Sequence, residues 1–184
     1  GTDVSSRVSS ESNVNINQIG VYHIRYTVLN DIWVLSEVTR TVAVYDPNDQ
    51  DQIDITGYYV TDMEASNNGK GTFASYSAQY THIIQCNGIV ISQLCPGIYT
   101  VRDMTGGWYS QIRGYGTPYE MIGHITIDDA GNVTLLDSHV AGWNNGLDYI
   151  ENAKYDADTA TISFDLSYLN AVFLHVVMYK IEDL

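Results

Sequence analysis

Alternation of apolar and polar residues with a period of two is the feature that most restricts how this chain can fold. Between residues 22 and 28 (YHIRYTV) the apolar side chains fall on one face, and His23, Arg25 and Thr27 fall on the other. Residues 119–128 alternate in the same way, whereas no segment of ten or more residues has a helical period. A period of two places successive side chains on opposite faces of a strand. The sequence therefore predicts an all-β fold of antiparallel strands.

Strand-like segments follow one another after residue 55, with turn-forming residues between them. The expected strands are residues 55–62, 80–85, 97–103, 119–128, 133–138, 161–166 and 171–180. Short strands at this spacing predict an antiparallel β-barrel or sandwich. The last of them is apolar on nearly both faces, so we expect it to lie centrally in its sheet. Asn87-Gly88 predicts a tight hairpin turn that pairs Cys86 with Ile89 and leaves Cys95 too distant for a disulfide bond.

Charge excludes two classes of partner. The chain has 22 acidic and 8 basic residues and a formal net charge of −14. Nucleic acids and anionic lipid surfaces are therefore not expected to bind, because Lys and Arg supply most of the affinity for both. The sequence contains no run of 18 or more apolar residues, the length that a membrane-spanning helix needs. The chain opens on Gly1 without a Met, so we expect a processed product whose only membrane contact is a lost lipid anchor.

Motifs for catalysis or metal binding are scarce in the sequence. No Gly-x-Ser-x-Gly elbow occurs, no two of the five His lie at i,i+2 or i,i+4, and the two Cys lack the spacing of metal ligands. Residues 46–57 do not match a calcium-binding EF-hand loop at its sixth and twelfth positions. We therefore predict no enzyme, no cofactor and no metal site. A pair of carboxylates for glycoside hydrolysis remains the less favoured alternative.

Aromatic residues next to Asp and Asn in two loops form the candidate binding site. The predicted ligand-binding residues are Asp103, Trp108, Tyr109, Tyr115, Trp143 and Asn144. Gly106-Gly107 permits a tight turn just before the first Trp-Tyr pair, which favours an outward position for the rings. Flat rings beside carboxylates and amides suit neutral sugars, whose apolar faces stack while their hydroxyls form hydrogen bonds. The alternative is that these rings are buried and close one end of the β domain.

The N-terminal part of the chain resembles a known kind of repeat. Residues 20–28 (GVYHIRYTV) and 39–44 (TRTVAV) resemble the last strands of bacterial immunoglobulin-like repeats, and residues 3–8 resemble the strand that precedes them. The resemblance implies a partial or complete immunoglobulin-like sandwich over residues 1–46, although such a sandwich usually needs about 100 residues. Residues 47–54 are polar and acidic and contain a Pro, so we expect a linker there.

Residues 55–184 resemble the C-terminal part of a family of gut Bacteroidetes surface lipoproteins of unknown function. The segments that carry the resemblance are residues 42–47, 55–60, 97–109, 123–133 and 155–159. The resemblance implies an antiparallel calycin-like β domain, display at the cell surface on the outer membrane, and capture of a glycan. It supplies no catalytic residues. We therefore expect a non-catalytic surface protein that binds a glycan or similar polar ligand, or else a structural or adhesive spacer that contacts neighbouring surface proteins.

Overall fold

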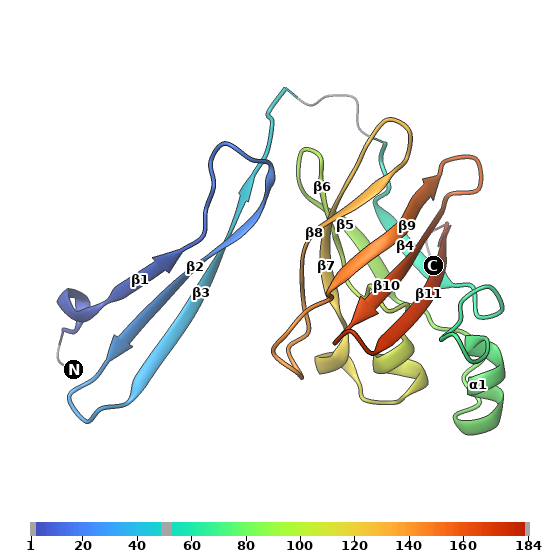
Figure 1. Cartoon of the computed structure of the whole chain (residues 1–184), viewed down its shortest axis with the longest axis horizontal. Coiled ribbons are helices and arrows are strands. Elements are labelled where there is room, and N and C mark those ends of the chain that lie inside the picture. The colour runs from blue at the N-terminus through green and yellow to red at the C-terminus, as the bar shows by residue number, and fades with distance from the viewer. Residues whose placement is uncertain (1–2, 49–52, 183–184) are drawn as a thin grey trace. The chain divides into compact units, whose positions relative to one another are not determined.

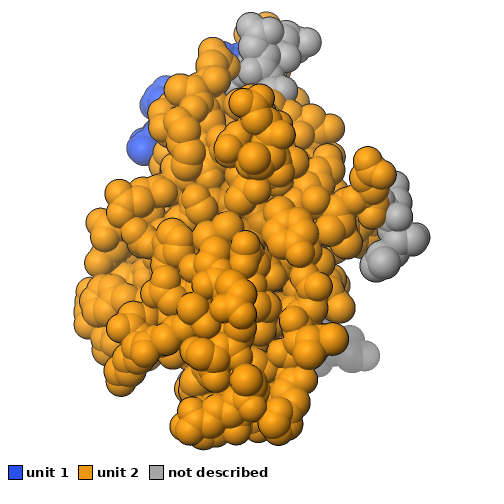
Figure 2. All heavy atoms as spheres, turned by 90° about the vertical axis from the view of Figure 1, so that its right-hand side faces the viewer, with its two compact units in different colours: residues 1–46 blue, residues 47–184 orange. Residues whose placement is uncertain are grey.

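A computed structural model describes residues 3–48 and 53–182 of the chain. The chain divides into two compact units, which Figure 2 colours separately: unit 1 (residues 1–46) and unit 2 (residues 47–184). Every strand pair in the described residues is antiparallel (Figure 1), which confirms the predicted all-β fold class. The predicted linker, residues 47–54, lies partly outside the described residues. No helix in the described part is long and apolar enough to cross a membrane.

Unit 1 is a single three-stranded sheet in the order β1 (Ser9–Ser12), β2 (Gly20–Leu29), β3 (Leu35–Val44). The prediction of a strand at residues 3–8 is wrong, because this segment contains a short 3-10 helix, η1 (Ser5–Arg7). The described residues of unit 1 contain no second sheet, so the immunoglobulin-like sandwich is not confirmed. Tyr26 lies opposite Val38 on the apolar face, and Val38 remains 65% exposed.

Unit 2 is built on one eight-stranded sheet in the order β8-β7-β6-β5-β4-β11-β10-β9 (Figure 1). Its strands are β4 (Gly57–Thr61), β5 (Ile89–Cys95), β6 (Ile98–Val101), β7 (Ile122–Ile127), β8 (Val133–His139), β9 (Tyr149–Asp156), β10 (Thr161–Tyr168) and β11 (Val172–Ile181). The two edge strands approach each other where Asn132 bridges to Lys154 and the Tyr155 N–H donates to the Gly131 carbonyl at 2.8 Å. The sheet is therefore a nearly closed barrel.

The core of unit 2 lies inside this curved sheet. Phe164 and Leu166 on β10, together with Leu174 and Val176 on β11, are fully or almost fully buried. Strand β11 lies between β4 and β10, the central position that its two-sided apolar pattern predicts. Three outward-facing residues of the same strands, Asp165, Phe173 and His175, form part of the candidate site described below.

A short helix replaces a strand that the sequence predicts. Helix α1 (Phe73–Tyr80) begins after Thr72, whose side chain accepts a hydrogen bond from the Ser75 N–H at 3.1 Å. Such an N-cap satisfies one of the free donors at the start of a helix. Phe73 and Ser77, one helical turn apart, face the core. The strand predicted at residues 80–85 is therefore wrong, and irregular chain leads from α1 to β5.

The first hairpin after α1 turns at Pro96-Gly97 and not at Asn87-Gly88. Cys95 pairs with Ile98 across this two-residue turn, and Gly97 has a φ of +75°. Asn87 and Gly88 precede β5, so the predicted pairing of Cys86 with Ile89 is wrong. Both cysteines are free thiols.

Thiol labelling is expected to distinguish the two cysteines. Burial, with the nearby Asp103 carboxylate adding to it, raises the pKa of the Cys86 thiol to about 12. Cys95 is partly exposed, and burial raises its pKa as well. Only the thiolate reacts, so a maleimide reagent should modify Cys95 in the folded protein and Cys86 only as unit 2 unfolds. Mass spectrometry of time points with and without urea measures this, and equal labelling in the native state would contradict it.

Candidate functional site

One turn of π-helix positions the aromatic residues that the sequence singles out. This turn, η2 (Trp108–Ile112), follows two consecutive glycines in the left-handed conformation, with φ of +61° at Gly106 and +79° at Gly107. A Cβ on Gly106 would come within 2.9 Å of Val176, and one on Gly107 within 2.8 Å of Cys86. Only glycine therefore fits both the backbone conformation and the space. Single π-turns of this kind are often found at functional sites.

The first side chain of η2 points toward α1. The Trp108 ring lies 4.8 Å from Phe73 and 4.8 Å from Tyr76, measured between ring centroids. Its side chain is 4% exposed. Trp108 is thus a core residue that anchors the helix, and the predicted exposed position for this ring is wrong.

The next side chain, Tyr109, points the other way into a second group of rings, which we call the aromatic cluster. Its members come from η2, the segment after it, the loop between β8 and β9, and the end of β10: Tyr109, Tyr115, Tyr119, Trp143 and Tyr168. Trp143 is central, with its ring centroid 4.8 Å from both Tyr109 and Tyr119 and 5.3 Å from Tyr168. Edge-to-face contacts of this kind add stability beyond the area that they bury.

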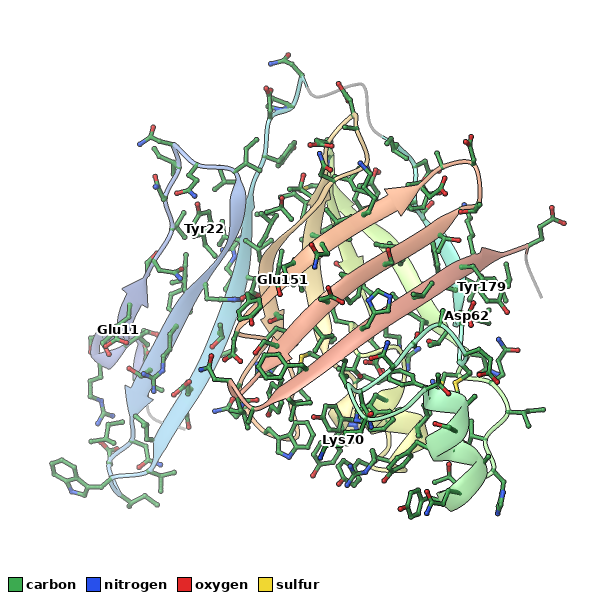
Figure 3. All side chains as sticks on the ribbon, turned by 45° about the vertical axis from the view of Figure 1, so that its right-hand side comes forward. Glu11, Tyr22, Asp62, Lys70, Glu151 and Tyr179 are labelled. Carbon is green, nitrogen blue, oxygen red and sulfur yellow. The ribbon has the colours of Figure 1, made fainter. Side chains whose placement is uncertain are left out.

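A hollow of about 330 Å³, which we call the end pocket, opens beside these rings. Its wall is formed by the loop before α1, by η2 and by the β10–β11 hairpin. The lining residues are Asn68, Gly69, Lys70, Trp108, Tyr109, Arg113, Ala171, Val172, Phe173 and Leu174. Figure 3 labels Lys70, whose loop lies at the same end of unit 2 as α1. Phe173 is 56% exposed, so its ring is available to a ligand.

A smaller hollow of about 210 Å³ adjoins the end pocket and shares Gly69, Phe173 and Leu174 with it. Its polar wall is a row across three strands, in which Asp165 on β10 lies opposite both Glu151 on β9 and His175 on β11. Asp165 Oδ1 lies 2.6 Å from His175 Nδ1, and Oδ2 accepts from Asn152 at 2.7 Å.

The electrostatics of Asp165 do not favour a role as a general acid. Burial raises the pKa of the Asp165 carboxyl, but hydrogen bonds from Asn152 and His175 outweigh it and hold the pKa below its usual value. A general acid in glycoside hydrolysis needs a raised pKa instead. No group of three or more His, Cys, Asp or Glu in the described residues could hold a metal ion.

Asp103 is buried and does not reach the site. Its Oδ1 accepts from the Thr105 hydroxyl at 2.7 Å and the Thr105 N–H at 3.0 Å, and its Oδ2 accepts from the Ser110 hydroxyl at 2.6 Å. Burial raises its pKa above the usual carboxyl value, although these hydrogen bonds oppose the shift. Asp103 therefore braces the chain between β6 and η2, and its predicted place at the edge of a binding surface is wrong.

The structure brings together only part of the predicted site. Tyr109, Tyr115 and Trp143 meet in the aromatic cluster, and Asn144 is exposed in the turn that carries Trp143, with a φ of +52°. Tyr109 is only 7% exposed, so the predicted exposed position is wrong for this ring as well as for Trp108. Three further residues, Lys70, Arg113 and Phe173, line the end pocket although the sequence did not predict them as site residues. One signal could have indicated Lys70, because it is one of only 8 basic residues and stands between two glycines.

The fold and the pocket define an all-β, barrel-type domain with a polar and aromatic hollow at one end. A family model described as "-like, C-terminal domain" matches residues 48–180, and the chain belongs to this family. The chain is also similar to the crystal structure of the lipoprotein BT2262 from Bacteroides thetaiotaomicron, with 28% identity and a TM-score of 0.59. The match covers 98% of this chain and 85% of that one. No curated protein matches the chain.

Proposed function

We propose that this chain is a non-catalytic lipoprotein of the bacterial cell surface that captures a glycan or a similar polar, ring-shaped ligand in the end pocket. The similarity to the lipoprotein BT2262 supports a place in the cell envelope. The composition of the pocket wall supports ligand binding, because it combines the exposed ring of Phe173 and the mostly buried ring of Tyr109 with the polar loop of Asn68 and Lys70. Binding sites for small polar ligands combine such aromatic surfaces with a few fixed polar groups.

The single observation that carries this proposal is the position of Phe173. Its ring is more than half exposed although it lies on a central strand, and it lines both hollows. Exposing the apolar surface of a large ring to water is unfavourable in free energy. Contact between the ring and the apolar face of a sugar would remove that surface from water. The other rings at this end pack against one another.

Replacing Phe173 with alanine is expected to weaken glycan binding by about 2 kcal/mol, the usual effect of truncating an aromatic anchor. An array screen of the whole soluble chain, with and without calcium, first identifies a bound glycan, and titration calorimetry then measures its affinity. Tyr179→Ala is the matched control, because Tyr179 lies on the same strand and face as Phe173, six residues further on, and lines neither hollow (Figure 3).

Equal affinities of Phe173→Ala and the unmodified chain would place any binding elsewhere. An array on which the whole chain binds no glycan would overturn the proposed function itself. Phe173 is exposed, so its removal is expected to leave the free energy of unfolding nearly unchanged, and a loss of binding would not reflect unfolding.

The second candidate is a structural or adhesive spacer that contacts neighbouring surface proteins. The observation that favours it is the apolar face of unit 1, where Tyr26 and Val38 lie opposite each other and the described residues of that unit supply no second layer. Apolar patches of this kind often mark protein interfaces. Protein capture that depends on Val38 and not on Phe173 would favour this candidate over glycan binding.

A further inference from the structure

Basic residues are rare in this chain, and most of those in unit 2 have a partner within the protein. Of the 8 basic residues, five lie in unit 2. Arg102 forms an ion pair with Glu120 at 2.8 Å. Lys154 donates to the Ala130 carbonyl and to Asn132 Oδ1. Hydrogen bonds from Thr56 lower the pKa of the Asp54 carboxyl, and the nearby Lys180 adds a smaller effect in the same direction. Each of these three cations therefore has a partner within unit 2.

The remaining two cations, Lys70 and Arg113, both line the end pocket. Neither forms an ion pair with a carboxylate among the described residues, although the chain has 22 acidic residues. Both side chains are exposed. In a protein with a net charge of −14, two unpaired cations in one hollow form a local positive site within a negative field.

The structure orients the guanidinium of Arg113 and fixes the backbone of the loop that carries Lys70. The guanidinium of Arg113 lies 5.7 Å from the Tyr76 ring centroid and 5.5 Å from that of Tyr115, and it donates to the Tyr115 hydroxyl at 3.0 Å. Asn68 Oδ1 accepts from the N–H of Lys70 at 2.9 Å and shapes the loop that carries it. An oriented guanidinium loses less freedom when it binds an anion than a free side chain would.

We propose that the end pocket binds its ligand through an anionic group on the ring, a carboxylate or a sulfate, which Lys70 and Arg113 hold. This inference rests on the proposed function, because it names the chemical class of the captured glycan as an acidic sugar. Arginine suits such groups, since its planar fork can donate two parallel hydrogen bonds to two oxygens. The ring of the same sugar lies against Phe173, and its hydroxyls extend toward the neighbouring hollow of Glu151 and Asp165.

The charges of the neighbouring hollow support this orientation of the bound sugar. Glu151 and Asp165 are acceptors for hydroxyl groups and repel an anionic group. The anionic group of the ligand is therefore directed to the Lys70 side of Phe173 and the uncharged side of the sugar to the Asp165 side.

Titration calorimetry with two pairs of probes tests the proposal. Oligogalacturonides carry a carboxylate on each ring, and their methyl esters keep the ring without the charge. Sulfated and unsulfated galactan oligosaccharides form the second pair. We expect the charged member of at least one pair to bind about tenfold tighter, as charge-assisted hydrogen bonds allow. A preference for the charged member of the first pair identifies the anionic group of the ligand as a carboxylate. A preference for the charged member of the second pair identifies it as a sulfate.

Substitutions connect that preference to the two cations. Lys70→Gln and Arg113→Gln are each expected to weaken binding of the charged probe about tenfold and to abolish most of its preference over the neutral one. Lys180→Gln makes the same change in net charge roughly 20 Å away along β11 and should leave binding within twofold. Raising the salt concentration from 50 to 500 mM should weaken binding of the charged probe alone.

Two results would overturn the inference and leave the proposed function intact: neutral and charged members binding equally, or charged probes binding Lys70→Gln and Arg113→Gln as tightly as the unmodified chain. If no member of either pair binds, and the array is also negative, the proposed function fails as well. Both cations are exposed, so thermal unfolding of the variants should match that of the unmodified chain.

Discussion

Replacing Trp108 with alanine is expected to lower the free energy of unfolding of unit 2 by about 3–5 kcal/mol, the usual cost of removing a large ring from a core. The indole is 4% exposed and packs between Phe73 and Tyr76. Its removal leaves a cavity beneath α1, and the two-turn helix has few other means of attachment, since among its residues only Phe73 and Ser77 are buried. Urea denaturation followed by circular dichroism measures the change.

Trp33→Ala is the matched control for this measurement. Trp33 is the same residue type but is 82% exposed in unit 1, so its removal should change the stability of unit 2 by less than about 0.5 kcal/mol. A loss below about 1 kcal/mol for Trp108→Ala would contradict the buried position of this ring. Such a result would instead favour the exposed position of the Trp108 ring that the sequence predicted.

The parts of the fold that depend on alternation could be predicted from the sequence. Strand β7 lies within residues 119–128, which alternate clearly, and the turn that leads to β8 contains Asp128, whose side chain accepts from the N–H groups of Ala130 and Asn132. Such local hydrogen bonding is a property of the residues themselves and needs no tertiary contact. The central place of β11 follows in the same way from apolar residues on both of its faces.

Helix α1 and the first hairpin could not be predicted, because tertiary contacts decide them. Eight residues are too few for a stable isolated helix, so α1 depends on burial of Phe73 and Ser77 against the barrel. Asn87-Gly88 is a good turn sequence, but the hairpin forms at Pro96-Gly97, which also permits a two-residue turn. Local preference alone does not choose between two such turns.

The candidate site was predictable in its region and not in its detail. The sequence predicted that the rings of Trp108, Tyr109, Tyr115 and Trp143 meet, and the aromatic cluster brings the last three of them together. Because Trp108 is adjacent to Tyr109 in the sequence, it was expected to join the same group of rings. The π-turn separates the two neighbours, because Trp108 faces α1 while Tyr109 faces the cluster. A π-turn produces no periodic pattern in the sequence, so no pattern indicated that Trp108 faces α1.

Replacing Asp103 with alanine is expected to lower the free energy of unfolding by about 3–5 kcal/mol, because it leaves several buried donors without an acceptor. The donors are the Thr105 N–H, the Thr105 hydroxyl and the Ser110 hydroxyl, all within 3.0 Å of the carboxylate. They tie the end of β6 to η2, so the loss should also disturb the end pocket. Asp103→Asn keeps Oδ1 and lets the Ser110 hydroxyl rotate to accept from the new amide, and its cost should be only about 1–2 kcal/mol.

The pH dependence of stability separates the charge of Asp103 from its hydrogen bonds. Burial raises the pKa of this carboxyl in the folded chain above its value of 3.8 in the unfolded one, so the folded state holds the proton more tightly. The resulting stabilisation is fully present below pH 3.8 and is lost as the pH rises through the folded pKa. The unfolding free energy of the unmodified chain minus that of Asp103→Asn should therefore fall as the pH rises from about 3 to 7. The subtraction cancels the other acidic residues, which titrate in both proteins. A difference that stays constant across this range would mean that the hydrogen bonds from Thr105 and Ser110 offset the effect of burial, and one that rises with pH would mean that they outweigh it.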